Sequence, residues 1–149
     1  YIGVPKFQKW VNDKKFDGGQ LSKEETELRD FYKRLLNFTI SSSALMGPYQ
    51  EIHYYNKEHT AGYDHRIFSF VRWSDDQKLI IISNFDDQRK ERLEMKVPKE
   101  VVSQWQLPDG EQVLIDALYG KKEVLTVKEG IGHLTIGLNP LESFIFEIK

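Results

Sequence analysis

The sequence predicts a mainly β protein: an antiparallel β-sandwich of about eight strands with Greek-key-like connections, preceded by one amphipathic α-helix. Two observations support this fold class. One stretch of helical periodicity lies before residue 40, and after it short apolar segments recur between turn sequences rich in Gly, Asp and Ser. We therefore expect an irregular segment and a helix over residues 1–40, and a β-sandwich domain over residues 41–149.

The helix is the first regular element. Ser22 followed by Glu25 fits a capping box, in which each side chain binds the other residue's backbone N–H. The apolar residues after it repeat with a period of 3.6 and so share one face of a helix. These positions are Leu28, Phe31, Tyr32, Leu35 and Leu36. The pattern predicts a helix over about residues 23–38.

Strand-like segments follow a serine triplet at Ser41–Ser43. Most alternate between apolar and polar residues, which is typical of strands with one exposed face, whereas Leu79–Ile82 is continuously apolar and predicts a strand buried on both faces. The predicted strands are Tyr49–Tyr55, Arg66–Trp73, Lys78–Asn84, Arg92–Val97, Gln112–Asp116, Val124–Val127, Ile131–Ile136 and Ser143–Ile148.

Composition excludes several classes of protein. Forty per cent hydrophobic and 30% charged residues are ordinary for a globular chain. The net charge of 21 − 23 = −2 gives no general attraction to nucleic acid, and the lack of cysteine excludes disulfides and thiol chemistry. The sequence contains neither a membrane-spanning apolar run nor a signal peptide's apolar segment, so we expect a soluble chain with no membrane partner, in an undetermined compartment.

Motifs for catalysis, phosphate binding and metal binding are absent from the sequence. His59 and His65 lack the spacing of a zinc site, and no nucleophile elbow or Gly-rich phosphate loop occurs. The pairs Asp75-Asp76 and Asp86-Asp87 could bind calcium, but Asp is also common in turns, which is the interpretation we favour. We expect no catalytic residue, no metal site and no cofactor.

Aromatic residues are enriched, at 13% of the chain. An aromatic ring can stack on the apolar C–H face of a sugar, which makes Tyr54, Tyr55, Tyr63, Trp73 and Trp105 candidate carbohydrate platforms. Trp105, Tyr63 and Trp73 are the candidate carbohydrate-binding residues, the first two because they lie in irregular segments. The alternative, which is more common in strands, is that such rings pack inside the sheet.

Several segments occur in a familiar order: FDGGQLS, the helix LRDFYKRLLNF, the strands RIFSFVRWSDDQKLIIISNF and the closing LNPLESFIFEIK. Together they resemble the C-terminal part of the α-amylase superfamily, glycoside hydrolase family 13, in which the last barrel helix leads into a β-sandwich called domain C. The helix residues Leu28, Arg29 and Phe31 fit that pattern, as do Phe68 and Phe70 in the first long strand. An Arg and a Pro common after the family's helix are missing here.

This resemblance implies a non-catalytic domain that stabilises the catalytic barrel of a parent enzyme acting on α-glucans such as starch or maltodextrin. The family's catalytic carboxylates lie on barrel strands that this sequence does not contain. The expected partners are the barrel of the same parent chain, α-glucan, and a second copy bound through the helix face of Leu28, Phe31, Tyr32, Leu35 and Leu36. Two alternatives stay open: a carbohydrate-binding module for α-glucans, and a free-standing enzyme with a carboxylate site.

Overall fold

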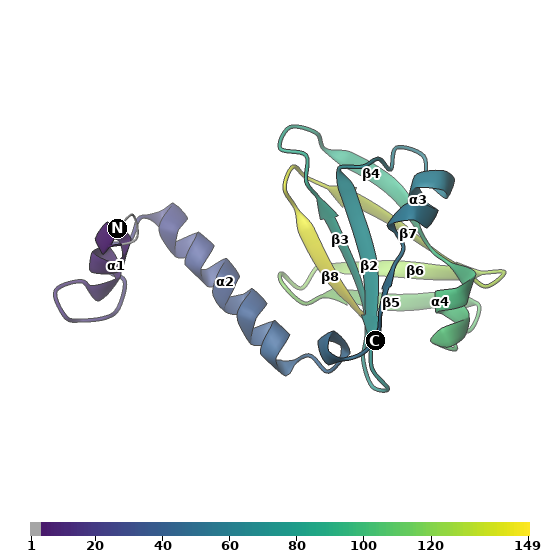
Figure 1. The fold of residues 1–149 in the computed structure, drawn as a ribbon, viewed down its shortest axis with the longest axis horizontal. Coiled ribbons are helices and arrows are strands. Elements are labelled where there is room, and N and C mark those ends of the chain that lie inside the picture. The colour runs from purple at the N-terminus through teal and green to yellow at the C-terminus, as the bar shows by residue number, and fades with distance from the viewer. Residues whose placement is uncertain (1–3) are drawn as a thin grey trace. The chain divides into compact units, whose positions relative to one another are not determined.

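The computed structural model describes residues 4–149, which divide into two compact units, one ending at Ile40 and the other spanning Ser41–Lys149 (Figure 1). The first unit is helical and the second contains the sheet. Within the described part of the chain, no helix is both long and apolar enough to cross a bilayer.

The first unit consists of two helices, α1 (Val4–Val11) and α2 (Lys23–Ser41). The capping box is confirmed, because the N–H of Ser22 donates to Oε2 of Glu25 at 3.0 Å and the N–H of Glu25 donates to Oγ of Ser22 at 3.2 Å. The prediction of an irregular segment before α2 is wrong where α1 forms. Side chains of α1 contact α2. The guanidinium carbon of Arg29 lies 4.0 Å from the ring centroid of Trp10, and Nζ of Lys9 lies 3.1 Å from Oε1 of Glu25.

The second unit contains one eight-stranded antiparallel sheet and three short helices. The strands are β1 (Tyr49–Glu51), β2 (Ile67–Trp73), β3 (Lys78–Asn84), β4 (Glu91–Val97), β5 (Gly110–Asp116), β6 (Lys122–Lys128), β7 (Ile131–Leu138) and β8 (Ser143–Ile148). The helices are the 3₁₀ turn η1 (Ala44–Met46), α3 (His53–His59) and α4 (Lys99–Gln104).

The predicted fold class, mainly antiparallel β with eight strands after a helix, is confirmed. The strands form one curled sheet in the order β1-β2-β3-β8-β5-β6-β7-β4, in which β4 lies beside β7 as in a Greek key. Figure 1 shows β5 and β6 passing behind β2 and β3. The curl encloses one core to which both halves contribute, including Val71, Ile80 and Phe146 from one side and Leu125 and Leu134 from the other.

The strand predicted over Tyr49–Tyr55 is wrong after Glu51, because the chain turns there into α3. The carboxylate of Glu51 accepts the N–H of Tyr54 at 3.1 Å. This backbone N–H lies in the first turn of α3, where the helix itself offers no acceptor. Asn56 is fully buried on the inner side of α3. The other predicted strands are present, and those at Lys78–Asn84 and Ser143–Ile148 have the predicted ends.

The start of the second unit is bound to the turn between β2 and β3. Oε1 of Gln77 accepts the hydroxyl of Ser42 at 2.6 Å and the N–H of Ala44 at 3.0 Å. Gly47 allows close approach of the two segments, since a Cβ at this position would lie 1.9 Å from the carbonyl oxygen of Trp73. Any other residue at position 47 would therefore displace the backbone.

Candidate functional site

The three candidate carbohydrate-binding residues, Trp105, Tyr63 and Trp73, do not form an exposed site. Trp105 and Tyr63 are only 4% and 5% exposed, and Trp73 is partly buried against the core. The prediction that Trp105 and Tyr63 present their rings to a sugar is therefore wrong. Trp105 follows α4 and packs edge to face on Trp73. Tyr63 follows α3 and belongs to the buried core.

Tyr63 is held inside the protein by its hydroxyl group. The hydroxyl hydrogen-bonds to Oγ of Ser69, itself fully buried on β2, at 2.8 Å. Burial raises the pKa of Tyr63 from 10.0 to about 12, because the phenolate would lose its hydration. The ring is thus a neutral core residue at physiological pH.

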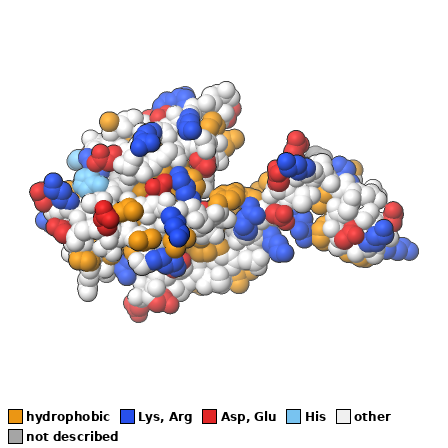
Figure 2. Space-filling model, turned by 180° about the vertical axis from the view of Figure 1, so that it is seen from behind, with side chains coloured by type: hydrophobic (Ala, Val, Ile, Leu, Met, Phe, Trp, Pro, Cys, Tyr) orange, Lys and Arg blue, Asp and Glu red, His pale blue; other side chains and the backbone are white. Residues whose placement is uncertain are grey.

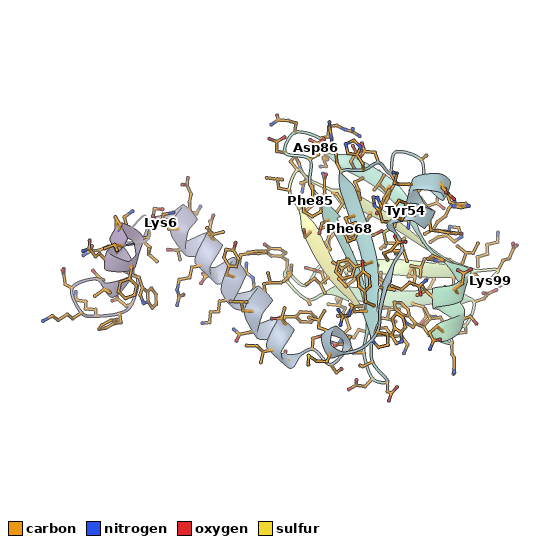
Figure 3. All side chains as sticks on the ribbon, viewed as in Figure 1. Lys6, Tyr54, Phe68, Phe85, Asp86 and Lys99 are labelled. Atoms are coloured by element: carbon orange, nitrogen blue, oxygen red, sulfur yellow. The ribbon has the colours of Figure 1, made fainter. Side chains whose placement is uncertain are left out.

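Another group of rings lies beside β1, β2 and α3, and only the two tyrosines at its ends are exposed. They form a row in which neighbouring ring centroids are 5.3 to 5.8 Å apart. This aromatic row consists of Tyr49, Phe70, Phe68, His53 and Tyr54. Figure 3 shows Phe68 on β2 and Tyr54 on α3, the outer end of the row. Tyr54 and Tyr49 are 66% and 52% exposed.

The row arises from the two-residue alternation of β2. Ile67, Ser69 and Val71 are buried, so Phe68 and Phe70 take the opposite face. His53 is oriented by its Nδ1, which lies 2.9 Å from the carbonyl oxygen of Ile67. Sequence reasoning named Tyr54 as a candidate platform and Phe68 and Phe70 as part of the family resemblance, but it did not join them into one surface.

The same face of the sheet stays apolar beyond β2. Phe70 pairs with Ile81 on β3, which pairs with Ile145 on β8, so these side chains share one face. Their sequence neighbours Ile80 and Phe144 belong to the enclosed core. We call the set Phe68, Phe70, Ile81 and Ile145 the outer apolar face; its members lie opposite the core.

The predicted helix face is the second uncovered apolar surface. No residue of α2 is buried, and Leu28, Tyr32 and Leu36 are each more than half exposed. Phe31 and Leu35 are partly buried. Apolar side chains at this spacing normally lie against another element, so α2 has a face made for packing.

Both aspartate pairs lie in turns. Oδ1 of Asp76 accepts the hydroxyl groups of Ser74 at 2.6 Å and of Ser43 at 2.8 Å. Asp86, in the loop after β3 (Figure 3), accepts the N–H groups of Gln88 and Arg89 at 2.8 and 2.9 Å. Among residues 4–149, no three His, Asp or Glu side chains are grouped so that they could hold a metal ion.

The loop contacts of Asp86 also explain its acidity. The two backbone N–H groups, followed by the guanidinium of Arg66, stabilise the carboxylate and lower the pKa of Asp86 from 3.8 to about 2. Asp86 therefore acts as an ionised anchor of the loop.

Comparison with known proteins supplies a family. Residues 58–149 match the model described as the alpha amylase, C-terminal all-beta domain. A search of curated protein sequences found no match.

Solved structures share the fold at low identity. AmyP in complex with maltose is 20% identical, with a TM-score of 0.59 over 85% of this chain and 21% of that chain. An Anoxybacillus alpha-amylase is 15% identical, with a TM-score of 0.56 over 90% of this chain and 25% of its own. The Geobacillus thermoleovorans alpha-amylase complexed with acarbose is 12% identical, with a TM-score of 0.58 over 87% of this chain and 25% of its own. The chain thus spans about a fifth to a quarter of these proteins.

Proposed function

The chain belongs to the α-amylase C-terminal all-β domain family, and from this premise we propose that it stabilises the catalytic barrel of an α-amylase-type glycoside hydrolase acting on α-glucans. In this role the chain performs no hydrolysis itself. It supplies the last helix of the barrel, α2, and a β domain that covers part of the barrel surface.

The outer apolar face is the observation that carries this proposal. Curling of the sheet already encloses a core, so Phe68 and Phe70 contribute nothing to it from the opposite face. Phe68 and Phe70 stay partly exposed beside Ile81 and Ile145, which are only 7% and 8% exposed. Apolar groups left uncovered on a sheet face are typical of surfaces that bind another protein surface. Because the solved relatives are about four times as long as this chain, the proposed occupant is the rest of the same parent polypeptide.

The exposed face of α2 supports the same occupant. Leu28, Tyr32 and Leu36 lie three or four residues apart, as expected for a helix that packs on a larger body through one side. A barrel helix must bury such a face, since burial contributes about 25 cal/mol per Å² of apolar surface.

The test is a pair of Phe→Ser substitutions in the full-length parent and in the isolated chain. Phe68→Ser with Phe70→Ser should lower the thermal midpoint of the parent while changing that of the isolated chain little, because the two rings meet the barrel only in the parent. Val113→Ser with Val124→Ser is the matched control, since these valines are apolar, exposed and paired with each other across β5 and β6. Equal effects of the Phe pair on parent and isolated chain would refute the proposal.

Catalysis is tested separately. The isolated chain should release no reducing sugar from starch or maltodextrin, whereas turnover would favour the free-standing enzyme. The carbohydrate-binding module remains as a second candidate because of an open cleft beside Tyr119 that is lined by both charged and aromatic side chains.

A further inference from the structure

Strands β6 and β7 are joined by a tight hairpin and then separate. They pair only where residues 126–128 face residues 131–133. Beyond that point β6 continues to pair with β5, and β7 continues to pair with β4. Residues 122–125 and 134–138 therefore have a strand neighbour on one side only, and the sheet opens between them.

The hairpin determines which backbone groups point into the opening. In an antiparallel pair, residues that exchange hydrogen bonds alternate with residues that do not. Lys128 and Ile131 flank the two-residue turn and so form a hydrogen-bonded pair. Every second residue counted from them directs its N–H and C=O toward the opening. In the separated part of the two strands, these residues are Lys122, Val124, Thr135 and Gly137.

The backbone groups of these four residues have no strand partner. Just before β6, the carbonyl oxygen of Lys121 accepts the N–H of Asp116 on β5 at 2.8 Å, so the carbonyl group of Lys122 faces the other way. Among residues 4–149, no backbone hydrogen bond outside the strand ladders involves any of the four. A Cβ at Gly137 would meet no heavy atom within 4 Å, so this part of β7 is open to a neighbouring chain.

Two adjoining hollows lie along this opening, and we call them together the cleft. The larger has a volume of about 830 Å³ and the smaller of about 570 Å³, and Glu123 and Thr135 line both. Gly137 lines the larger hollow, whereas Lys122 and Val124 line the smaller one. The cleft thus presents backbone donors and acceptors at every second residue, which is the repeat that a polypeptide backbone matches within a sheet.

The charges of the cleft balance. Its lining has four positive and four negative side chains, which gives 4 − 4 = 0. They are Lys90, Arg92, Lys121, Lys122, Glu91, Glu94, Glu123 and Glu142. Figure 2 shows positive and negative side chains interspersed on the face that it presents. A balanced lining favours an occupant without net charge, because neither sign of charge gains a complementary surface.

The open part of β7 carries no charged residue. Soluble proteins commonly protect a strand edge with charged side chains, which oppose pairing with another chain. β6 has Lys122 and Glu123 in its open part, whereas residues 134–138 of β7 read LTIGL. Thr135 and Ile136 are β-branched, which suits a strand inside a sheet. β7 is therefore the edge that accepts a further strand.

We propose that an extended, uncharged segment of another protein binds in the cleft as an additional strand. The segment pairs antiparallel with β7, and the N–H and C=O groups of Thr135 and Gly137 supply its backbone partners. A separate protein is the proposed occupant because the surfaces assigned to the barrel lie elsewhere, on α2 and on β2, β3 and β8. The inference does not depend on the role of the chain beside the barrel.

The experiment is amide hydrogen exchange of the 149-residue chain, measured by nuclear magnetic resonance, with the peptide acetyl-(Thr-Val)₃-amide at millimolar concentration. This peptide is uncharged and β-branched throughout. Near saturation it should slow the exchange of the N–H groups of Thr135 and Gly137 by about tenfold or more. The N–H groups of Leu134 and Ile136 face β4 and already belong to a ladder, so their exchange should change little.

Two substitutions at one position separate backbone recognition from side-chain recognition. Thr135→Pro removes the N–H that faces the cleft, a change that strand edges tolerate, and should weaken peptide binding by about tenfold or more. Thr135→Ser is the matched control, because it keeps that N–H and should bind the peptide like the wild type. Near-ultraviolet circular dichroism establishes that each variant is folded.

A modified peptide tests the same backbone contacts on the wild-type chain, in case Thr135→Pro does not fold. The peptide carries N-methyl groups on its two central residues, which blocks both of its edges. Its affinity should be lower than that of the unmodified peptide by about tenfold or more, because a methylated nitrogen cannot donate to a strand.

Four outcomes would overturn the proposal. The first is unchanged exchange at Thr135 and Gly137 in the presence of the peptide, and the second is equal affinity of folded Thr135→Pro and Thr135→Ser. The third is protection of these amides by maltoheptaose but not by the peptide, which would favour the carbohydrate-binding module. The fourth is protection that rises with protein concentration without peptide, which would indicate strand pairing between two copies of this chain. None of them would disturb the barrel-stabilising role, which is measured through Phe68 and Phe70.

Discussion

The side-chain amide of Asn56 binds both backbone polar groups of Lys96. The N–H of Lys96 donates to Oδ1 at 2.8 Å, and Nδ2 donates to the carbonyl oxygen of Lys96 at 2.8 Å. The same amide also accepts the hydroxyl of Thr60 and donates to the carbonyl oxygen of Ile52. A fully buried residue of α3 is thereby joined to β4, forty residues further along the chain.

Replacement of Asn56 should destabilise the β domain. Asn56→Ala leaves both backbone groups of Lys96 without this partner, and the expected loss is at least about 2 kcal/mol of unfolding free energy. Asn56→Asp should also destabilise, because a carboxylate cannot donate to the two carbonyl oxygens. Urea denaturation measures both variants, with exposed Glu58→Ala on the same helix as the control. A wild-type midpoint for Asn56→Ala would contradict the assigned network.

Trp105 should act through packing. Its ring lies edge to face with Trp73, with centroids 6.2 Å apart, so Trp105→Ala is expected to cost about 3–5 kcal/mol of unfolding free energy. Trp105→Phe should cost less, because it keeps an aromatic ring and removes an indole Nε1 that has no hydrogen-bond partner among the described residues. Guanidinium denaturation tests the order of the two variants. If Trp105→Ala instead retained stability but lost sugar binding, the buried assignment would be wrong.

Asp86 should contribute an acid-sensitive part of the stability. Its folded-state pKa, about 2, lies below the ordinary value of 3.8, so its ionised form stabilises the fold above about pH 4. This stabilisation is lost as the pH falls from about 4 to about 2. The difference in unfolding free energy between the wild type and Asp86→Asn should therefore shrink over that interval. Asp87→Asn, its exposed neighbour, serves as the control, and a difference independent of pH would argue against the assignment.

The isolated chain should self-associate through α2. Leu28, Tyr32 and Leu36 are exposed, so sedimentation analysis should detect dimers that increase with concentration. Leu36→Glu should shift the equilibrium to the monomer by placing a charge in the apolar face. Lys33→Gln changes the net charge by the same −1 on the polar side of the helix and should leave the dimer intact. A wild-type monomer at high concentration would rule out this surface as a dimer interface.

Local patterns in the sequence were sufficient for much of the fold. The capping box at Ser22 and Glu25 placed the start of α2, since both hydrogen bonds join residues within one turn. The continuous apolar run of β3 correctly predicted a strand buried on both faces. Each signal depends on residues close together in the chain.

The face that each β2 residue occupies was decided only by the tertiary structure. Ile67 and Val71 alternate with Phe68 and Phe70, and either set is apolar enough to enter the core. Pairing with β1 and β3 and the curl of the sheet placed the phenylalanines outside. The burial of Asn56 could not be predicted from the sequence either, because the backbone group that binds its side chain belongs to Lys96 on β4.

Sequence alone therefore determined the class of the protein, the helix, most strands and the resemblance to the α-amylase C-terminal part, because these follow from local periodicity, capping and motif order. Tertiary structure decided that Trp105 and Tyr63 are buried, that Phe68 and Phe70 form an outer surface, and that β6 and β7 open into a cleft. The exposure of a side chain depends on which distant segments cover it, and that covering is set by strand pairing across the whole sheet.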